Sequence, residues 1–358
     1  MPGLTKNLLE RRSQGTLNDY VTAIAWSPNA STLAIASAAG EIVLVNPESQ
    51  AELTLQEANG QSTDCLDFSA DGRYLAAGGQ SGQLLIWPLD PHTHSPTAPP
   101  TRLANPRTWL DRLTWNPICN ELAFSLGRYA QVWDAEADGV ATTLQFDNSS
   151  VLDLAWHPQG SHLIVGGHQG IKIWQRDDWY ADPAVREMAA ASVAIALSPD
   201  GRYLASGNLD RTLLVWPFDS EEPWRMTGFP GKVRQLAWSD ITVGQAPLLA
   251  SASGTGIVTW HKKSNASDGW DARVLDLHQQ RVNAIAFQPG NTLLASAAED
   301  GQICLWKQAQ QATQILEGAS QGFSTLAWSP DGQWLAAGGK QGEWLVWKQG
   351  KRGKGFGR

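Results

Sequence analysis

One set of side chains in this sequence has the residue types of a nucleophilic catalyst. His278, Ser296 and Asp300 lie close together along the chain. A serine, a histidine and a carboxylate in mutual contact can perform acyl transfer, because the imidazole takes the proton of the serine hydroxyl. The sequence has no G-x-S-x-G motif and no glycine-rich phosphate loop leading into a helix. The three residue types alone therefore do not indicate an enzyme.

The histidines do not form a recognisable metal motif. His92 and His94 lie in a proline-rich stretch, and two ligands on such a loop do not make a site. The other histidines weighed as ligands are scattered and lack a carboxylate pattern: His157, His162 and His261. We therefore expect no metal and no cofactor.

The cysteines and the N-terminal residues bear on the compartment. Cys65, Cys119 and Cys304 are odd in number, lack metal-type spacing and lie in or beside strand patterns. They are predicted to be buried free thiols in a reducing compartment. The first residues, MPGLTKNLLERRSQG, lack the apolar run of a signal peptide, and no stretch approaches the ~18 apolar residues of a membrane helix. These features predict a cytoplasmic protein.

The chain is acidic as a whole but basic at one end. Its 358 residues carry a formal net charge of −8, which argues against nucleic acid as a partner of the whole surface. Residues 348–358, KQGKRGKGFGR, contain five basic residues. This segment has the charge to contact RNA, an acidic protein or an anionic membrane. We expect a disordered, solubilising tail.

The elements that must position these residues recur along the chain. Residues 323–347, FSTLAWSPDGQWLAAGGKQGEWLVW, read as three short strands, because alternating apolar runs end at Asp-Gly or Gly. From Trp87 to Trp347 the closing tryptophans are 41 to 46 residues apart, and this fixed period predicts a repeat architecture. The eight copies, given by their first and third strands, are Val21–Trp26 with Ile42–Val45, Cys65–Phe68 with Leu84–Trp87, Leu110–Trp115 with Ala130–Trp133, Val151–Trp156 with Ile171–Trp174, Val193–Leu197 with Leu213–Trp216, Val233–Trp238 with Ile257–Trp260, Val282–Phe287 with Ile303–Trp306, and Phe323–Trp328 with Trp344–Trp347.

With these motifs the chain resembles the WD40 repeat family over nearly its whole length. The resemblance rests on A-W-S-P at Ala25–Pro28 and Ala327–Pro330, S-P-D-G-R-Y-L-A at Ser198–Ala205, and D-G-Q-I-C-L-W at Asp300–Trp306. It implies four-stranded blades arranged radially around a channel. We therefore predict an all-β fold, an eight-bladed β-propeller forming one domain over residues 1–347. Among the closing tryptophans, only Trp133 is followed by an aspartate, Asp134, as in the Trp-Asp pair that names the family.

The resemblance gives the catalyst-like set a structural interpretation. WD40 blades often carry an Asp-His-Ser/Thr-Trp hydrogen-bond set, and only the seventh copy matches it, with Asp300, His278, Ser296 and Trp306. The imidazole would bridge the carboxylate and the hydroxyl, while the indole N–H finds a buried partner. No catalytic residue is assigned, and the other blades are expected to hold together mainly by packing.

The N-terminal segment, residues 1–20, is predicted to close the ring. The residues after Trp347 show no strand pattern, so the last copy lacks an outer strand. Asn7–Glu10 (NLLE) resembles Gln314–Glu317 (QILE), the outer strand before the eighth copy. We predict that the N-terminal segment completes the last blade and removes an exposed edge.

Loops on the face that the family calls the bottom have two interpretations. Pro88–Pro106 contains six prolines and is expected to be a tolerated surface insertion, with a peptide-docking segment as the alternative. Aromatic residues in polar connections either cap their blades, which we favour, or form an exposed patch that binds a partner. These residues are Trp179, Tyr180, Trp224 and Trp270.

The opposite, top face comprises the turns from outer to first strands and from second to third strands, and in WD40 proteins it most often receives partners. Trp109 and Tyr20 suit a binding hot spot, and Lys232 and Arg281 suit acidic partner groups. The candidate partner-binding residues are Tyr20, Asp64, Trp109, His168, Lys232, Arg281, Glu299 and Lys340.

We predict a non-enzymatic scaffold that docks partner proteins or peptides on the top face and channel mouth. A rigid surface loses little conformational entropy on binding. The protein would act as a monomer or as part of a hetero-complex, with no nucleic acid except through the basic tail. The alternative is a ligand- or metal-binding propeller, which includes the case of an enzyme, using the channel mouth.

Overall fold

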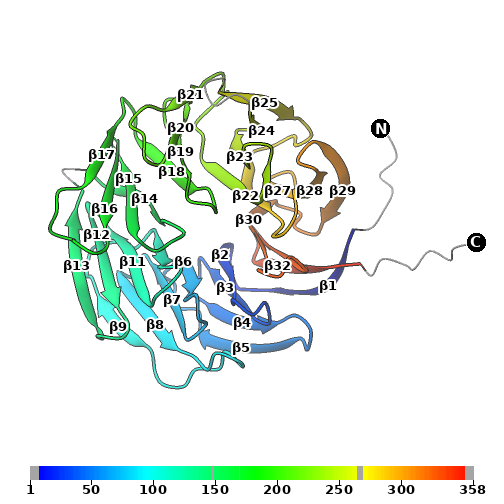
Figure 1. Cartoon of the computed structure of the whole chain (residues 1–358). Helices are drawn as coiled ribbons and strands as arrows, with labels where there is room; N and C mark the ends of the chain where they lie inside the picture. The colour runs from blue at the N-terminus through cyan, green and yellow to red at the C-terminus, as the bar shows by residue number, and fades with distance from the viewer. Residues whose placement is uncertain (1–7, 147–148, 169, 264–268, 351–358) are drawn as a thin grey trace, which may run out of the picture.

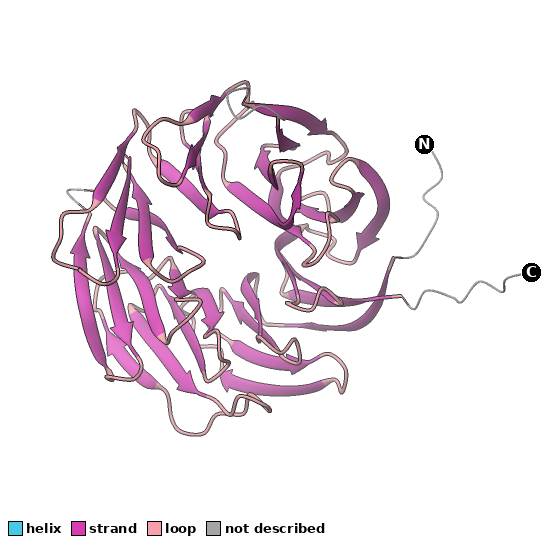
Figure 2. Ribbon diagram, viewed as in Figure 1, coloured by secondary structure: helices cyan, strands magenta, loops and turns pink. Residues whose placement is uncertain are grey.

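The computed structural model describes residues 8–146, 149–168, 170–263 and 269–350. These residues form 32 strands and no helix. The strands make eight four-stranded sheets, which stand side by side in a ring (Figure 1) and are joined by short loops (Figure 2). The predicted all-β, eight-bladed propeller is therefore confirmed.

The blades are numbered in chain order. Blade 1 contains β2 (Val21–Trp26), β3 (Leu33–Ser37), β4 (Ile42–Asn46) and β5 (Ala51–Gln56); blade 2 contains β6 (Thr63–Phe68), β7 (Tyr74–Gly79), β8 (Gln83–Pro88) and β9 (Thr101–Ala104). Blade 3 contains β10 (Leu113–Trp115), β11 (Glu121–Leu126), β12 (Tyr129–Asp134) and β13 (Gly139–Gln145); blade 4 contains β14 (Val151–Trp156), β15 (His162–Gly167), β16 (Gly170–Gln175) and β17 (Ala184–Glu187).

The second half of the ring follows the same order. Blade 5 contains β18 (Ser192–Leu197), β19 (Tyr203–Asn208), β20 (Leu213–Pro217) and β21 (Trp224–Met226); blade 6 contains β22 (Gln235–Val243), β23 (Ala246–Ser253), β24 (Gly256–Lys262) and β25 (Trp270–Leu275). Blade 7 contains β26 (Val282–Phe287), β27 (Leu294–Ala298), β28 (Gln302–Lys307) and β29 (Gln311–Glu317); blade 8 contains β30 (Phe323–Trp328), β31 (Trp334–Gly339), β32 (Glu343–Gln349) and β1 (Leu9–Thr16).

The turn between first and second strands shows how local sequence sets each blade. In blade 5, the Ser198 hydroxyl donates to Asp200 Oδ1 at 2.6 Å and accepts from the Tyr203 N–H at 2.9 Å. Gly201 follows with a φ of +73°, a left-handed conformation that favours glycine. The Ser-Pro-Asp-Gly sequence therefore builds a self-bonded turn that starts the second strand in register.

The predicted closure of the ring is confirmed. β1 pairs antiparallel with β32, from Leu9 opposite Gln349 to Thr16 opposite Glu343. In Figure 1 this first, blue strand lies beside the last, red one. The strand extends well beyond the NLLE stretch, because a bulge between Arg11 and Ser13 lets pairing continue along β32.

Four expected boundaries need correction. β10 begins at Leu113 rather than Leu110, and β22 begins at Gln235 rather than Val233. Pro88–Pro106 is not one excursion, because it contains the outer strand β9. The basic tail begins later than residue 348, since β32 runs to Gln349 and the Lys348 ammonium pairs with Glu48 at 2.6 Å. The rest of the tail, residues 351–358, lies outside the described residues, as does Asn7.

Candidate functional site

The catalyst-like residues form a buried structural set inside blade 7. His278 Nδ1 lies 3.0 Å from Asp300 Oδ2, and His278 Nε2 lies 2.8 Å from the Ser296 hydroxyl. That hydroxyl also accepts from the Trp306 indole N–H at 2.8 Å. Ser296 has no exposed surface and His278 only 3%, so no substrate reaches the hydroxyl. The geometry agrees with the structural interpretation.

Two other blades carry buried polar networks in addition to their packed cores, which the expectation did not include. In blade 1 the buried Glu41 accepts from the Asn18 backbone N–H and side-chain amide, each at 2.7 Å, and from the Ser37 hydroxyl at 3.1 Å. In blade 5, a chain of hydrogen bonds joins five side chains: Ser192, Ser206, Asn208, Thr212 and Asp210. Both networks use residue types that the family pattern does not predict.

Neighbouring blades are joined by a recurring tryptophan contact. In five blades the indole N–H of the first-strand tryptophan donates to a backbone carbonyl on the first strand of the preceding blade. We call this contact the Trp link. The five links are Trp26 to Ala327 at 3.2 Å, Trp115 to Asp67 at 3.1 Å, Trp156 to Thr114 at 3.2 Å, Trp238 to Ala196 at 3.2 Å, and Trp328 to Ala286 at 3.2 Å. These tryptophans therefore serve the core and are not a ligand cage.

Three other side chains join blades at the bottom turns. They occupy the turn position that is a serine in most repeats, the first residue of Ser-Pro-Asp-Gly. Each of them contacts the turn glycine of the next blade. Asn116 donates to Gly160 O at 3.1 Å, His157 to Gly201 O at 3.2 Å, and Gln288 to Gly332 O at 2.7 Å. A long polar residue at this turn position was the available sequence signal, and it was missed.

The two predicted rings of turns do share the top face. Backbone hydrogen bonds join them: Ala38 N to Tyr20 O at 2.9 Å, and Glu299 N to Arg281 O at 2.9 Å. Trp109 is 60% exposed and Tyr20 37%. His168, Lys232 and Arg281 are also exposed, whereas Asp64 is half-buried.

Glu299 and Lys340 form an ion pair with each other. The Lys340 ammonium lies 2.9 Å from Glu299 Oε1, across the boundary between blades 7 and 8. Lys340, and then Asn283 and Arg281, lower the pKa of the Glu299 carboxyl. These two residues are therefore less available to a partner than the sequence suggested.

Blades 2 to 4 hold a further group of charges near the top face. The Asp64 carboxylate accepts from the Ser62 hydroxyl at 2.5 Å, and burial, with Asp111 nearby, raises its pKa. Arg112 Nε contacts Asp153 Oδ1 at 3.2 Å, and Asp153 Oδ2 accepts from the Ile195 N–H at 2.7 Å. Arg112 and Asp153 thus tie blades 3, 4 and 5 together. Their positions vary between repeats, so the sequence did not indicate them.

Most of the lower-face aromatic residues cap their blades. Trp179 packs edge-on against Trp156, with ring centroids 6.1 Å apart. Trp224 and Trp270 pack against each other at 6.2 Å and against Tyr203. The favoured capping interpretation agrees with this geometry. Tyr180 is the exception, because 99% of it is exposed.

The proline-rich loop is anchored rather than free. His94 is 1% exposed, its Nδ1 lies 3.0 Å from the Thr32 hydroxyl of blade 1, and its ring meets Phe68 edge-on at 5.6 Å. His94 is therefore a packing residue between blades 1 and 2, and the interpretation of a merely tolerated surface insertion is wrong for this part of the loop. Of the cysteines, Cys65 and Cys304 are buried as predicted, but Cys119 is only half-buried.

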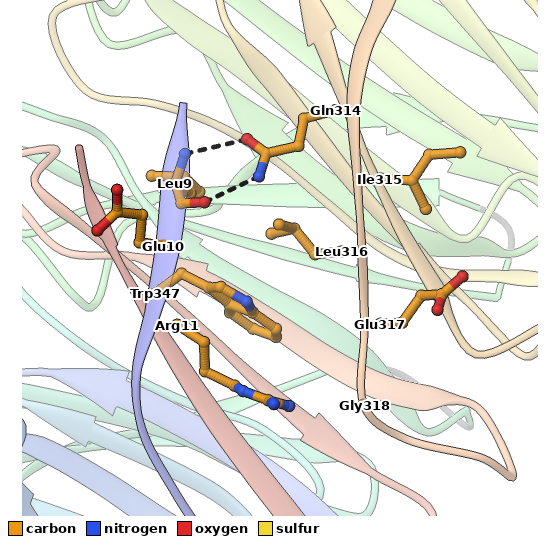
Figure 3. A pocket seen from close by; sticks show the side chains of 9 residues that line it. All are labelled: Leu9, Glu10, Arg11, Gln314, Ile315, Leu316, Glu317, Gly318 and Trp347. Carbon is orange, nitrogen blue, oxygen red and sulfur yellow. Dashed lines mark hydrogen bonds between the residues drawn. The ribbon is translucent and has the colours of Figure 1, made fainter. Parts of the chain in front are cut away.

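A groove of about 640 Å³ lies on the rim between β29 of blade 7 and β1 of blade 8. Figure 3 shows Gln314 reaching across it to Leu9. The Gln314 carbonyl oxygen accepts from Leu8 N at 2.8 Å and Leu9 N at 3.0 Å, and its amide N–H donates to Leu9 O at 2.8 Å. The side-chain amide thus imitates a paired strand residue, and we call it the Gln314 clasp.

No group of three or more His, Cys, Asp or Glu side chains is placed to hold a metal ion in the described ranges. The same part of the chain contains no helix long and apolar enough to cross a membrane.

The geometry defines a β-propeller assembled from eight similar blades. The family model "WD domain, G-beta repeat" matches residues 53–88, 140–175, 187–217, 269–307 and 310–348. These segments make up about half of the chain, and the chain belongs to the WD40 family.

Several eukaryotic proteins are similar at low identity. THO complex subunit 3 of Arabidopsis thaliana is 25% identical over 201 residues, which cover 54% of this chain and 61% of that protein. WD repeat-containing protein 18 of Homo sapiens is 26% identical over 259 residues, covering 64% and 57%. Protein HIR1 of Yarrowia lipolytica is 25% identical over 195 residues, covering 42% and 18%. The match therefore spans less than two thirds of each of these relatives.

Proposed function

We propose that this propeller is a protein-interaction scaffold that docks partner proteins or peptides on its top face and channel mouth. The observation that carries the proposal is Trp109, a large aromatic residue that is 60% exposed on a turn of that face. Exposing so much apolar surface is unfavourable in the free protein, whereas a partner that covers the indole gains buried area with little loss of side-chain entropy.

The contacts between blades and the similarity to a subunit of a complex also support this proposal. The Trp links and bottom-turn bonds hold the blades in fixed positions, so the turns of the top face form a preorganised surface. The similar proteins include one named as a subunit of a complex, THO complex subunit 3. We propose that this chain likewise works within a hetero-complex or as a monomer that recruits partners, without catalysing a reaction. Its cytoplasmic location stays a prediction.

Affinity capture from the lysate of the source cell tests the proposal. The wild-type protein is compared with Trp109→Ala and with Tyr180→Ala, which removes an exposed aromatic residue from the opposite face. We expect a stoichiometric protein that binds the wild type and Tyr180→Ala but is lost with Trp109→Ala. A hot-spot loss of at least ~2 kcal/mol weakens binding about 30-fold.

The other outcomes are equally informative. Capture that is lost only with Tyr180→Ala would move the docking surface to the bottom face. If no protein is captured by any of the three, the scaffold proposal fails, and a ligand-binding propeller becomes the better account.

A further inference from the structure

Four cationic residues lie on turns of the top face over blades 5 to 7. They are Arg211, Lys232, Arg234 and Arg281, and all four are exposed. Hydrogen bonds link their turns: Val233 N donates to Asn208 O of blade 5 at 3.3 Å, and Val282 N donates to Gly254 O of blade 6 at 2.9 Å. The Ser253 hydroxyl next to Gly254 donates to Gly231 O at 2.7 Å, which connects this turn with the segment of Lys232. We call these four residues the basic patch.

The basic patch has no carboxylate within ion-pair distance among the described residues, although Glu299 lies close enough to Arg281 for its pKa to be lowered. Some cations elsewhere in the molecule are paired, as in Arg73 with Asp71 at 2.6 Å and Arg176 with Glu121 at 2.8 Å. Among the described residues, no hydrogen bond or ion pair is made by the side chains of the four patch residues. The nearby carboxylates are engaged, since Asp210 pairs with Arg225 at 3.5 Å and Glu299 with Lys340 at 2.9 Å.

A group of cations without ion pairs is notable in a chain with a formal net charge of −8. Like charges held together repel each other, and an anionic partner relieves that repulsion. Guanidinium groups bind carboxylates with two parallel hydrogen bonds, and three of the four patch residues are arginines. The patch therefore has the chemistry to bind a carboxylate-rich ligand.

Two features favour an acidic peptide over a nucleic acid. Leu209, which is 37% exposed, lies in the same turn as Arg211 and offers apolar contact to a peptide side chain. The negative charge of the whole protein also repels a long polyphosphate, whereas a short acidic segment feels mainly the local patch. We propose, building on the proposed scaffold function, that the basic patch docks an acidic segment of the partner protein.

The test uses the full-length protein and a fluorescein-labelled (Glu-Ala)6 peptide in an anisotropy titration at low salt. The patch variant combines Lys232→Gln, Arg234→Gln and Arg281→Gln. Arg211 is left unchanged, because its φ of +65° places it in a constrained turn. The matched control combines Arg102→Gln, Arg273→Gln and Lys307→Gln, which removes the same charge from exposed residues outside the top face.

We expect the patch variant to bind the peptide at least about tenfold more weakly, while the control stays within about twofold of the wild type. A (Gln-Ala)6 peptide should not bind. Equal losses in both variants would show that net charge alone matters, and would overturn the inference. A 12-nucleotide single-stranded RNA that binds the patch more tightly than the peptide would replace the acidic segment with nucleic acid.

This test separates the inference from the proposed function. If the patch variant keeps its affinity for the peptide while Trp109→Ala still loses its partner, the inference is wrong and the scaffold stands. If the peptide needs the patch but no protein depends on Trp109, the patch stands and docking at Trp109 fails.

Discussion

Neighbouring blades are joined in two different ways in this ring. Between blades 3 and 4, the Trp156 indole donates to the Thr114 carbonyl, as in four other boundaries. Between blades 4 and 5, Leu197 occupies the equivalent position and has no donor. There the contact depends on His157, which donates to Gly201 O at 3.2 Å, and on Asp153, which accepts from Ile195 N at 2.7 Å.

The difference shows that most blade boundaries share one contact, the Trp link, whereas the others are held by different side-chain contacts. Boundaries 1–2 and 6–7 also lack a Trp link, because their copies have Phe68 and Phe287. His94 and Thr32 join the first of these, and Asp240 accepts from Gly290 N at 2.8 Å in the second. Boundaries with the Trp link use an indole donor, whereas two of the other three use histidine, and burial lowers the pKa of one of these, His94.

The largest effect is expected from removing the strand that closes the ring, since both kinds of boundary depend on closure. Deleting residues 1–16 removes β1 and leaves β32 and the Gln314 side chain without their partners. We expect the melting temperature to fall by at least about 10 °C, or the protein to aggregate through its new edge. Thermal unfolding monitored by circular dichroism measures this.

Deletion of residues 1–7 is the matched control, because it leaves β1 intact. An unchanged melting curve after removal of residues 1–16 would contradict the closing role of the strand.

A second prediction compares a boundary that has a Trp link with one that does not. Trp156 is 6% exposed, so Trp156→Ala should lower the free energy of unfolding by about 3–5 kcal/mol. Trp156→Phe keeps most of the packing and should cost about 1 kcal/mol for the lost hydrogen bond. Leu197→Ala, at the boundary without a link, should cost about 2 kcal/mol. Urea unfolding gives all three values.

The alanine and phenylalanine variants of Trp156 would support a different conclusion if they lowered the free energy of unfolding by equal amounts. The hydrogen bond, rather than the buried ring, would then carry the contribution of the Trp link.

The smallest predicted effect concerns pH at the boundary between blades 4 and 5. Burial, and then the neighbouring His157, lower the pKa of His162. The unfolded chain, with an ordinary histidine pKa of about 6.5, therefore binds more protons than the folded one, so stability falls as the pH drops below that value. His162→Gln should reduce this acid-induced loss by less than about 1 kcal/mol, measured as unfolding free energy at two pH values.

Trp156→Phe serves as the control, because it introduces no titrating group and should retain the wild-type pH dependence. A His162→Gln variant with the full acid-induced loss would show that this boundary is not the sensitive one.

The fold was predictable because the sequence pattern of a blade recurs along the chain. Eight copies with a fixed spacing define the blades, and NLLE indicated the closing strand although its partner lies at the other end of the chain. Residues that appear once were not predictable. His94, Glu41 and Asp153 each bridge elements through a side-chain conformation that has no counterpart in the other copies.

The candidate site was predicted only in outline. The sequence placed Trp109 and Arg281 on one face, because turn positions follow from strand positions. It could not reveal that Lys340 binds Glu299, since both lie in turns of different blades, and ion pairing depends on side-chain distances. Arg211 and Arg234 were missed for the same reason, because their lack of ion pairs among the described residues is a property of the folded surface.

The pairing of β1 with β32 also sets the order of events during synthesis. At about 5–20 residues per second, a ribosome needs roughly 20–70 s between making Leu9 and making its partner Gln349. The first strand of the ring must wait unpaired until the last one emerges. Its sequence, LERRSQGT, places three charged residues in a row, and such charges discourage pairing with other nascent chains. The closing strand is thus protected by its own composition while it waits.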